Sequence, residues 1–142
     1  MTTTATATAT ATTRRHGLPA RAGVAAGLAV IGNLALSQAL ASAVDADPDF
    51  IGLQPASVAV ASAFGVLLGV VTFVVLARRG WERLFVPLVA VGALLSLGGP
   101  VSLLSATQAQ QPGVSDSAAL ALIPLHVLVA TVVAVVLRWR AR

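Results

Sequence analysis

Four long stretches of the chain contain no charged residue, and they limit the possible folds more than any other feature. A helix needs roughly 20 consecutive apolar residues to cross the hydrocarbon core of a bilayer. Strands of a membrane barrel would be about half as long. Helices are required because lipid offers no hydrogen-bond partner to exposed backbone groups. The sequence therefore predicts four transmembrane helices, at about residues 22–44, 55–77, 84–105 and 117–137.

The composition supports a membrane protein. Hydrophobic residues make up 57% of the chain and charged residues only 10%, whereas a soluble domain carries about 25% charged residues. These values exclude a soluble globular protein, and the absence of cysteine excludes disulfides and thiol chemistry. We expect one all-α domain over residues 18–138. A Thr/Ala-rich tail at residues 1–17 is predicted to be disordered, and residues 139–142 form a basic tail.

The arginines predict the orientation of the spans. All nine basic residues are arginines, and with four spans they all fall on one side of the membrane. Four of the five acidic residues fall on the other side. By the positive-inside rule, both termini are then cytoplasmic, and the short connections favour antiparallel neighbours. The sequence thus predicts an integral four-helix bundle with up-down-up-down topology, N-in and C-in.

The same arginines predict the surroundings of the protein. The composition is rich in Ala, Val and Leu and lacks Lys, which is typical of a GC-rich bacterial genome, so we expect the bacterial inner membrane. The pI of about 11.7 reflects arginines beside membrane spans, and we expect no nucleic-acid partner. These side chains would face lipid headgroups and attract anionic ones.

The first span could alternatively be a cleaved export signal. Arg14 and Arg15 precede it, and Ala41-Ser42-Ala43 matches a signal-peptidase pattern. The apolar run is longer than the usual 7–15 residues of a signal peptide. We therefore expect the first span to be retained.

Two pairs of glycines follow the small-xxx-small pattern that lets membrane helices approach closely. Gly23 and Gly27 form one pair in the first span, and Gly65 and Gly69 form the other in the second. We expect the helix faces that carry these glycines to pack inside the bundle. Alternatively, such a face joins two copies of the chain, or joins the chain to another membrane protein.

His126 is the only ionisable residue deep within a span, which makes it a candidate for function. At 1.5 Å per residue, it lies about 13 Å from the outer end of its helix, and Asn33 lies about 16 Å from the same surface. Ser96 has a similar depth, and Pro100 is expected to kink or break the third helix. The candidate polar pocket comprises Asn33, Ser37, Gln38, Ser96, Pro100, Ser102 and His126. The alternative is a neutral His126 that only bridges two helices.

The chemistry available to this pocket is limited. No acidic residue lies within a predicted span to pair with His126, which argues against a proton relay, a metal site or paired acid–base catalysis. No nucleotide, metal or nucleophile motif occurs, so we predict no cofactor, metal or catalytic residue. The favoured function is a structural or accessory membrane protein. The alternatives are small-molecule binding or transport through an outward-opening pocket, and, less favoured, an enzyme on a lipid-soluble substrate with His126 as base.

The chain resembles the small bacterial four-span proteins grouped as domain of unknown function 6069. The resemblance covers about residues 18–138. It lies in the arginine-bounded first span, in Arg78-Arg79-Gly80-Trp81, in the third-span segment from Leu94 to Ser102, and in Leu125-His126. The double glycine before Pro100 departs slightly from the family pattern. The resemblance implies a four-helix membrane protein and no particular activity.

Overall fold

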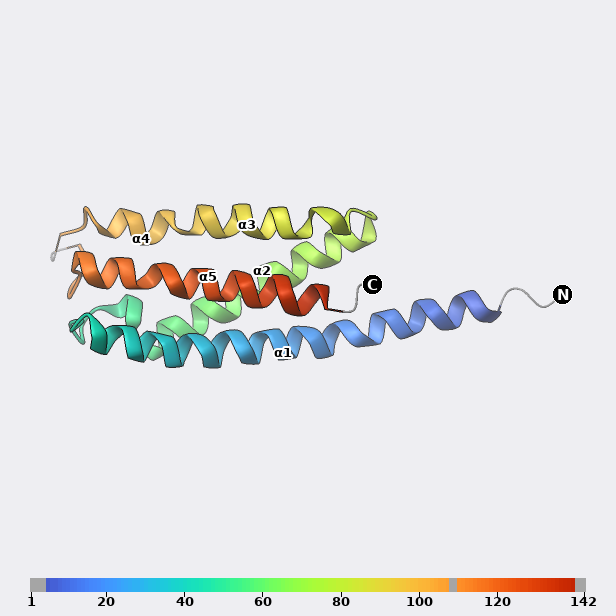
Figure 1. Ribbon diagram of the computed structural model, residues 1–142, viewed down its shortest axis with the longest axis horizontal. Helices are drawn as coiled ribbons and strands as arrows, with labels where there is room; N and C mark the ends of the chain where they lie inside the picture. The colour runs from blue at the N-terminus through green and yellow to red at the C-terminus, as the bar shows by residue number, and fades with distance from the viewer. Residues whose placement is uncertain (1–4, 108–109, 140–142) are drawn as a thin grey trace.

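The computed structural model of the chain is a helix bundle elongated along its helices (Figure 1). It describes residues 5–107 and 110–139, with side chains from residue 17 onward. Every regular element in this part of the chain is helical, as the sequence predicts. The elements are α1 (Ala5–Ala43), η1 (Ile51–Leu53), α2 (Pro55–Arg78), η2 (Glu82–Leu84), α3 (Phe85–Ser96), α4 (Gly98–Leu103) and α5 (Asp116–Arg138).

Four helical segments are long and apolar enough to cross a membrane, and they match the four predicted spans within a few residues. They are Gly17–Ala43, Pro55–Arg78, Glu82–Leu103 and Asp116–Arg138. Helix α1 begins at Ala5, inside the segment for which the sequence predicts disorder. Residues 1–4 and 140–142 lie outside the described residues, so disorder before Ala5 and the basic tail after Trp139 stay predictions.

The third span is interrupted at Leu97, which separates α3 from α4. Pro100 has no N–H to donate to the carbonyl of Ser96, and its ring crowds the preceding turn. Gly98 and Gly99 add backbone freedom beside it. The break therefore lies where the sequence predicts a kink or a broken helix.

The second span ends in a glycine-dependent turn. Gly80 has φ +70°, which residues other than glycine rarely adopt. The Trp81 N–H donates to the Leu76 carbonyl at 2.9 Å, and the Gly80 N–H donates to that of Ala77 at 3.3 Å. These two bonds form a Schellman motif that closes the helix end.

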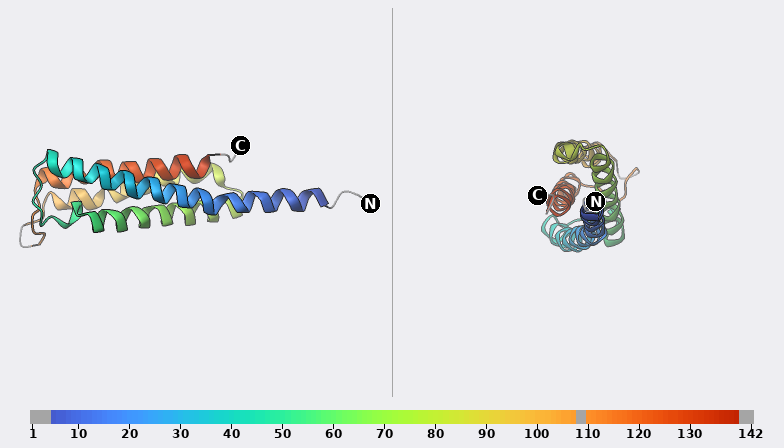
Figure 2. Two further views of the ribbon diagram at one scale, coloured as in Figure 1. Left: turned by 90° about the horizontal axis from the view of Figure 1, so that it is seen from below. Right: turned by 90° about the vertical axis from the view of Figure 1, so that its right-hand side faces the viewer.

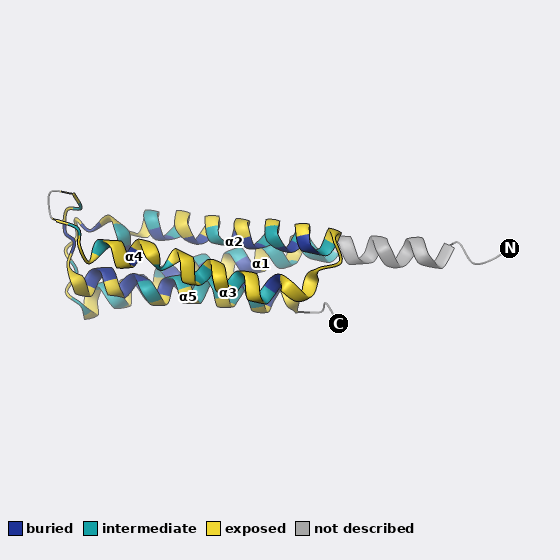
Figure 3. Cartoon of the chain, turned by 90° about the horizontal axis from the view of Figure 1, so that it is seen from above, coloured by how far each residue is buried: buried dark blue, intermediate teal, exposed yellow. Residues whose placement is uncertain are grey.

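Helix α5 is the central element of the bundle. It contacts α1, α2, α3 and α4, whereas α1 contacts only α2, α5 and η1 among the described elements. The end-on view shows α5 between α1 and the third span (Figure 2). Phe85 is the only buried residue of α3 and Pro100 the only one of α4, and the third span is largely exposed in Figure 3.

Two hydrophobic clusters hold the helices together. The Phe85 cluster joins all four spans, and in it the rings of Phe73 and Phe85 meet edge to face at 5.1 Å. The Phe50 cluster joins the connections to α2 and α5. The first contains Ala25, Ala29, Val66, Phe73, Leu76, Phe85, Val133, Val136 and Leu137. The second contains Phe50, Leu53, Val58, Val114, Ala118, Ala121, Leu122 and Leu125.

Further contacts close each end of the bundle. Beside the Phe85 cluster, Arg21 Nη1 donates to the carbonyls of Leu137 and Trp139, at 3.2 and 3.3 Å. A cation is favourable there because the C-terminus of a helix carries partial negative charge. Beside the Phe50 cluster, Gly113 has φ +72°, and a Cβ there would lie 2.6 Å from the Phe50 nitrogen. The two connections at this end thus pack backbone against backbone.

Candidate functional site

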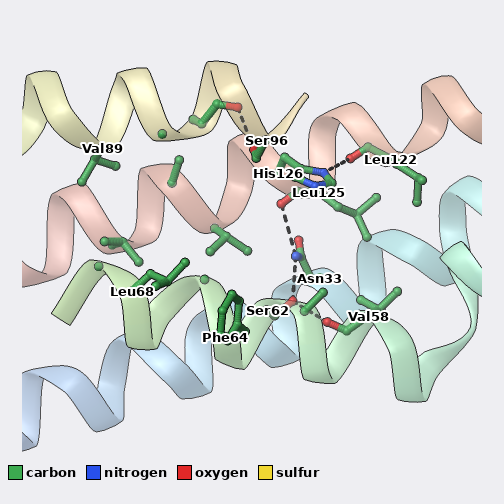
Figure 4. Close-up of a pocket in the computed structure, with 18 of the residues that line it drawn as sticks. Asn33, Val58, Ser62, Phe64, Leu68, Val89, Ser96, Leu122, Leu125 and His126 are labelled. Carbon is green, nitrogen blue, oxygen red and sulfur yellow. Dashed lines mark hydrogen bonds between the residues drawn. The ribbon is translucent and has the colours of Figure 1, made fainter. Parts of the chain in front are cut away.

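A cavity of about 570 Å³ lies between α2, α3 and α5, and Asn33 reaches it from α1 (Figure 4). Ligand sites commonly have volumes of roughly 300–1,000 Å³. On α2 the lining runs from Ser57 to Thr72, a length of about 22 Å at 1.5 Å per residue. Most lining residues are apolar. They include Phe64, Leu68, Leu88, Val89, Leu122, Leu125, Val129 and Val133.

The cavity exists because α2 packs closely on α5 and loosely on α3. A Cβ on Gly65 would lie 2.9 Å from Val129 Cγ1, and a Cβ on Gly69 would overlap Val133 Cγ1. Across the cavity, a Cβ on Gly92 of α3 would meet no atom within 4 Å. The missing side chains thus bring α2 against α5 and leave space beside α3.

Part of the cavity wall is exposed. Its lining includes exposed residues of α2 and of α3, among them Phe64, Leu68, Leu88 and Gly92. The Phe50 and Phe85 clusters lie toward its two ends. The lining also reaches Gly52 of η1, in the connection between α1 and α2. The expectation that the pocket opens outward at the membrane surface stays a prediction.

Asn33 is the polar centre of the cavity and is only 3% exposed. Its Nδ2 donates to Ser62 Oγ at 2.9 Å and to the Leu125 carbonyl at 3.2 Å. A carbonyl oxygen can only accept, so the amide must point its nitrogen toward Leu125. Its Oδ1 is then left without a partner among the described residues. An unpaired buried acceptor is costly, and this oxygen has almost no accessible surface, so it lies against neighbouring atoms and not in the open part of the cavity.

His126 and Ser96 line the same cavity from α5 and α3. The His126 ring lies 2.8 Å, at Nδ1, from the Leu122 carbonyl. The carbonyl only accepts, so Nδ1 carries the proton and Nε2 of the neutral ring is an acceptor. Ser96 Oγ donates to the Ala93 carbonyl at 2.7 Å. Figure 4 shows Ser96, His126 and the Asn33 amide around one part of the cavity.

Three of the seven residues predicted to form the pocket therefore line the cavity, namely Asn33, Ser96 and His126. The Asn33 bond to Leu125 places Asn33 beside the residue that precedes His126 on α5. The lining excludes Ser37, Gln38, Pro100 and Ser102.

Helix phase explains these exclusions. Ser37 is buried and bonds the Leu34 carbonyl of its own helix. Gln38 follows it by about 100° and is exposed. Ser102 lies six residues after Ser96, about 240° around the helix axis. Pro100 is buried but lies outside the lining.

The two glycine pairs differ in what they contact. Gly65 and Gly69 pack on α5 within the chain, as internal packing requires. Gly23 and Gly27 are exposed, and an added Cβ would meet nothing within 4 Å. Their predicted role in packing inside the bundle does not occur in the described structure, because that face of α1 points away from α2 and α5.

Two parts of the polar centre escape the sequence prediction. Ser62 is a polar residue of the second span that is not among the predicted pocket residues, and nothing in the sequence pairs it with Asn33. The Leu125 carbonyl is a backbone atom, and no side-chain pattern identifies it. Only a helical phase analysis across two spans could have suggested Ser62.

Comparison with protein-family models, with curated proteins and with solved structures finds no match to this chain. The resemblance to domain of unknown function 6069 stays a prediction. The function is therefore argued from the geometry of the cavity.

Proposed function

We propose that the protein is an integral protein of the bacterial inner membrane that binds a small, membrane-soluble molecule in the cavity between α2, α3 and α5. The membrane setting is supported by the exposed faces of the spans. Large apolar side chains there are more than half exposed, including Ile31, Val60, Phe64, Leu94 and Leu95. Apolar surface of this extent is rare on soluble monomers.

We propose up-down-up-down topology with both termini in the cytoplasm. The Arg21 bonds to Leu137 and Trp139 support it, because they join the start of the first span to the end of the last. Arginines near that end would attract anionic headgroups of the inner leaflet. The exposed Trp81 and Trp139 suit the interfacial zone.

Cysteine labelling tests the topology without background, because the chain has no native cysteine. An Asp47→Cys variant should react with a membrane-impermeant maleimide in intact spheroplasts. An Arg83→Cys variant should react only after permeabilisation. Reaction of both variants in intact spheroplasts would contradict the proposed orientation.

The observation that carries the binding function is a cavity of about 570 Å³ with exposed lining residues on both α2 and α3. We infer from them that the route into the cavity runs between these two helices. In a membrane that route leads to lipid and not to water. A molecule that reaches the cavity must therefore dissolve in the hydrocarbon phase.

Photolabelling in lipid vesicles tests this proposal. A diazirine-bearing alkane should label cavity-lining residues such as Leu125 and Val129 in a saturable way. Gly92→Phe should abolish this labelling, because Gly92 lines the cavity with open space at its Cβ. Gly98→Phe is the matched control, since Gly98 has equal space in the same span but lies outside the lining. Non-saturable labelling spread over the exposed Leu94 and Leu95 would refute the proposal.

A second candidate is the structural or accessory role favoured by the sequence. One observation supports it: Gly23 and Gly27 form a small-residue face of α1 that is exposed and uncontacted. Such a face lets another membrane helix approach closely. If it joins copies of the chain, Gly23→Leu should shift the mass of the detergent-solubilised protein toward a monomer, as measured by light scattering. Gly98→Leu should leave the mass unchanged.

A further inference from the structure

A row of side chains on α2 leads from the cavity to an arginine. Phe64, Leu68 and Thr72 line the cavity. Val75 and Arg79 follow them at helical spacing, and every member of the row except the half-buried Thr72 is exposed. At 100° per residue the five positions fall within an arc of about 80°. One face of α2 therefore carries part of the cavity wall and, beyond it, Arg79.

A matching row on the third span leads to the same point. Gly92 and Leu88 line the cavity from α3, and the exposed Leu84 lies four residues before Leu88. Trp81 comes three residues earlier still, and the Arg79 guanidinium lies over its ring, with 5.8 Å between Cζ and the ring centroid. The two helices meet at this turn and diverge away from it (Figure 1). Both rows thus end at one pair, Arg79 and Trp81.

The turn at this pair is rich in positive charge. Arg78, Arg79 and Arg83 stand there beside a single acid, Glu82, and all four side chains are exposed. Arg79 forms no salt bridge with a described residue. A guanidinium suits phosphate because its planar fork offers several hydrogen-bond donors, and tryptophan is typical of the headgroup level of a membrane. The turn therefore fits an anionic lipid headgroup.

The cavity has about the volume of one long hydrocarbon chain. A non-hydrogen atom with its hydrogens takes roughly 30 Å³, the share of one water molecule in the liquid. At that share, the cavity of about 570 Å³ holds about 19 such atoms. This suits a single acyl chain and is too little for two. The mostly apolar lining, about 22 Å long on α2, also suits an extended chain.

The polar side chains of the wall bond within the protein. Asn33 donates to Ser62 and to a backbone carbonyl of α5. Ser62 and Ser96 each donate to a carbonyl of their own helix, and His126 Nδ1 lies 2.8 Å from a carbonyl of α5. A hydrocarbon chain can therefore lie beside these side chains without breaking a hydrogen bond.

We infer that the ligand of the cavity is an anionic phospholipid, which places one acyl chain between α2 and α3 and its phosphate at Arg79. The inference rests on the proposed function and names the class of its ligand. Arg79 lies seven residues after Thr72, about 10 Å along the helix axis, so the charge lies beyond the end of the cavity. A phospholipid separates its phosphate from the chain by a glycerol backbone, whereas a fatty acid carries its charge on the chain itself. The spacing therefore favours the phospholipid.

Photolabelling with two matched lipids tests the inference on the full chain in phosphatidylcholine vesicles. The probes are phosphatidylglycerol and phosphatidylcholine with a diazirine at the same position of one acyl chain, so they differ only in the headgroup. We expect the anionic probe to label Leu125 and Val129 at about a fivefold lower concentration, because one arginine near an anionic lipid changes binding by about that factor. Equal labelling by the two probes would overturn the inference.

Variants of the turn separate binding at Arg79 from a general attraction to arginines. Arg79→Gln should bring the two probes to equal labelling, and Arg79→Lys, which keeps the charge, should retain most of the preference. Arg83→Gln is the matched control, since it makes the same change of charge in the same turn. Arg83 lies five residues before Leu88, about 140° around a helix axis, and so lies off the row that leads to the cavity. Equal losses in Arg79→Gln and Arg83→Gln would overturn the assigned site.

Further probes separate this inference from the proposed function. Gly92→Phe should abolish labelling of Val129 by the anionic lipid, whereas Gly98→Phe should preserve it. A fatty acid with the same diazirine chain should label the cavity less than phosphatidylglycerol does, and stronger labelling by the fatty acid would overturn the choice of a phospholipid. If the diazirine alkane labels the cavity saturably but the two phospholipids do not differ, the proposed function survives and the inference fails. If the alkane labelling does not saturate, the proposed function itself fails.

Discussion

The bundle has a closely packed part, formed by α1, α2 and α5, and a loosely attached part, the third span of α3 and α4. In the most apolar window of each span, α5 is 33% buried and the third span only 11%. Both are strongly apolar, so hydropathy does not explain the difference. The difference is explained by small residues that lie against a neighbouring helix. A Cβ added at Gly65 or Gly69 would clash with α5, whereas a Cβ added at Gly92, Gly98 or Gly99 of the third span would meet no described atom within 4 Å.

This difference shows how a membrane bundle can form a cavity. Lipid solvates apolar side chains as well as a neighbouring helix does, so close packing and hydrogen bonds hold membrane helices together. Where both are present, as between α2 and α5, the helices meet. Where both are sparse, as between α2 and α3, a cavity remains.

The largest test of the comparison removes the anchor of the third span. Phe85 is fully buried and packs on Phe73. Phe85→Ala should lower the free energy of unfolding in detergent by about 3 kcal/mol, near the lower end of the range for soluble cores. Lipid or detergent, and not water, would solvate the exposed surface. Val91→Ala, at a position 51% exposed, should change the free energy of unfolding little. Equal losses would show that Phe85 is not the main contact of α3.

A second test disrupts the close contact of the packed part. Gly69→Leu would force a side chain into Val133 of α5 and should cost about 2 kcal/mol, as overpacking typically does. Gly92→Leu is the matched change in the third span and should be nearly neutral. Thermal unfolding followed by circular dichroism measures both.

Rescue separates a steric effect from a change in helix propensity. Val133→Ala should restore much of the stability lost in Gly69→Leu, because it vacates the same volume. If the double variant is no more stable than Gly69→Leu, close contact is not what joins α2 to α5.

A third test removes the polar link of the packed part. Asn33→Ala deletes two hydrogen bonds that join α1 to α2 and α5. Interhelical bonds in membranes average about 0.6 kcal/mol, so the loss should be about 1 kcal/mol. Ser102→Ala serves as control, since that hydroxyl bonds only Gly99 of its own helix. Denaturation in mixed micelles measures the free energy of unfolding of both variants. A loss in Ser102→Ala as large as that in Asn33→Ala would contradict the role of the interhelical bonds.

The smallest test concerns the bonds that join the first and last spans. Arg21→Gln should destabilise the protein by about 0.5 kcal/mol, the usual size of a cation at a helix C-terminus. The loss should shrink at high salt because partly exposed charges are screened. Arg83→Gln, at an exposed site without such bonds among the described residues, should show neither effect. A salt-independent loss would indicate that packing of the Arg21 stem matters more.

Much of the fold could be predicted because it depends on local composition. The span limits follow from runs without charge, and the four helices of the structure agree with them. The break in the third span follows from Pro100, whose missing N–H acts within its own helix. Such features need no knowledge of which helix lies beside which.

The site was predictable only in part. Asn33, Ser96 and His126 are rare polar residues at similar depth, and depth follows from the rise per residue. Gln38 and Ser102 share that rarity but face elsewhere, because the rotation of each helix depends on its neighbours. Gly23 and Gly27 have the same spacing as Gly65 and Gly69, and yet a Cβ added at either would meet nothing within 4 Å in the described part of the chain.

That this chain forms four apolar spans, and roughly where each lies, follows from local sequence, because solvent preference and backbone hydrogen bonding are properties of each segment. The packing of α2 on α5, the cavity beside α3 and the lack of a partner for Asn33 Oδ1 among the described residues emerge only from the folded structure. Those outcomes depend on complementary shapes and on backbone atoms from three helices meeting at one point, which no single segment encodes.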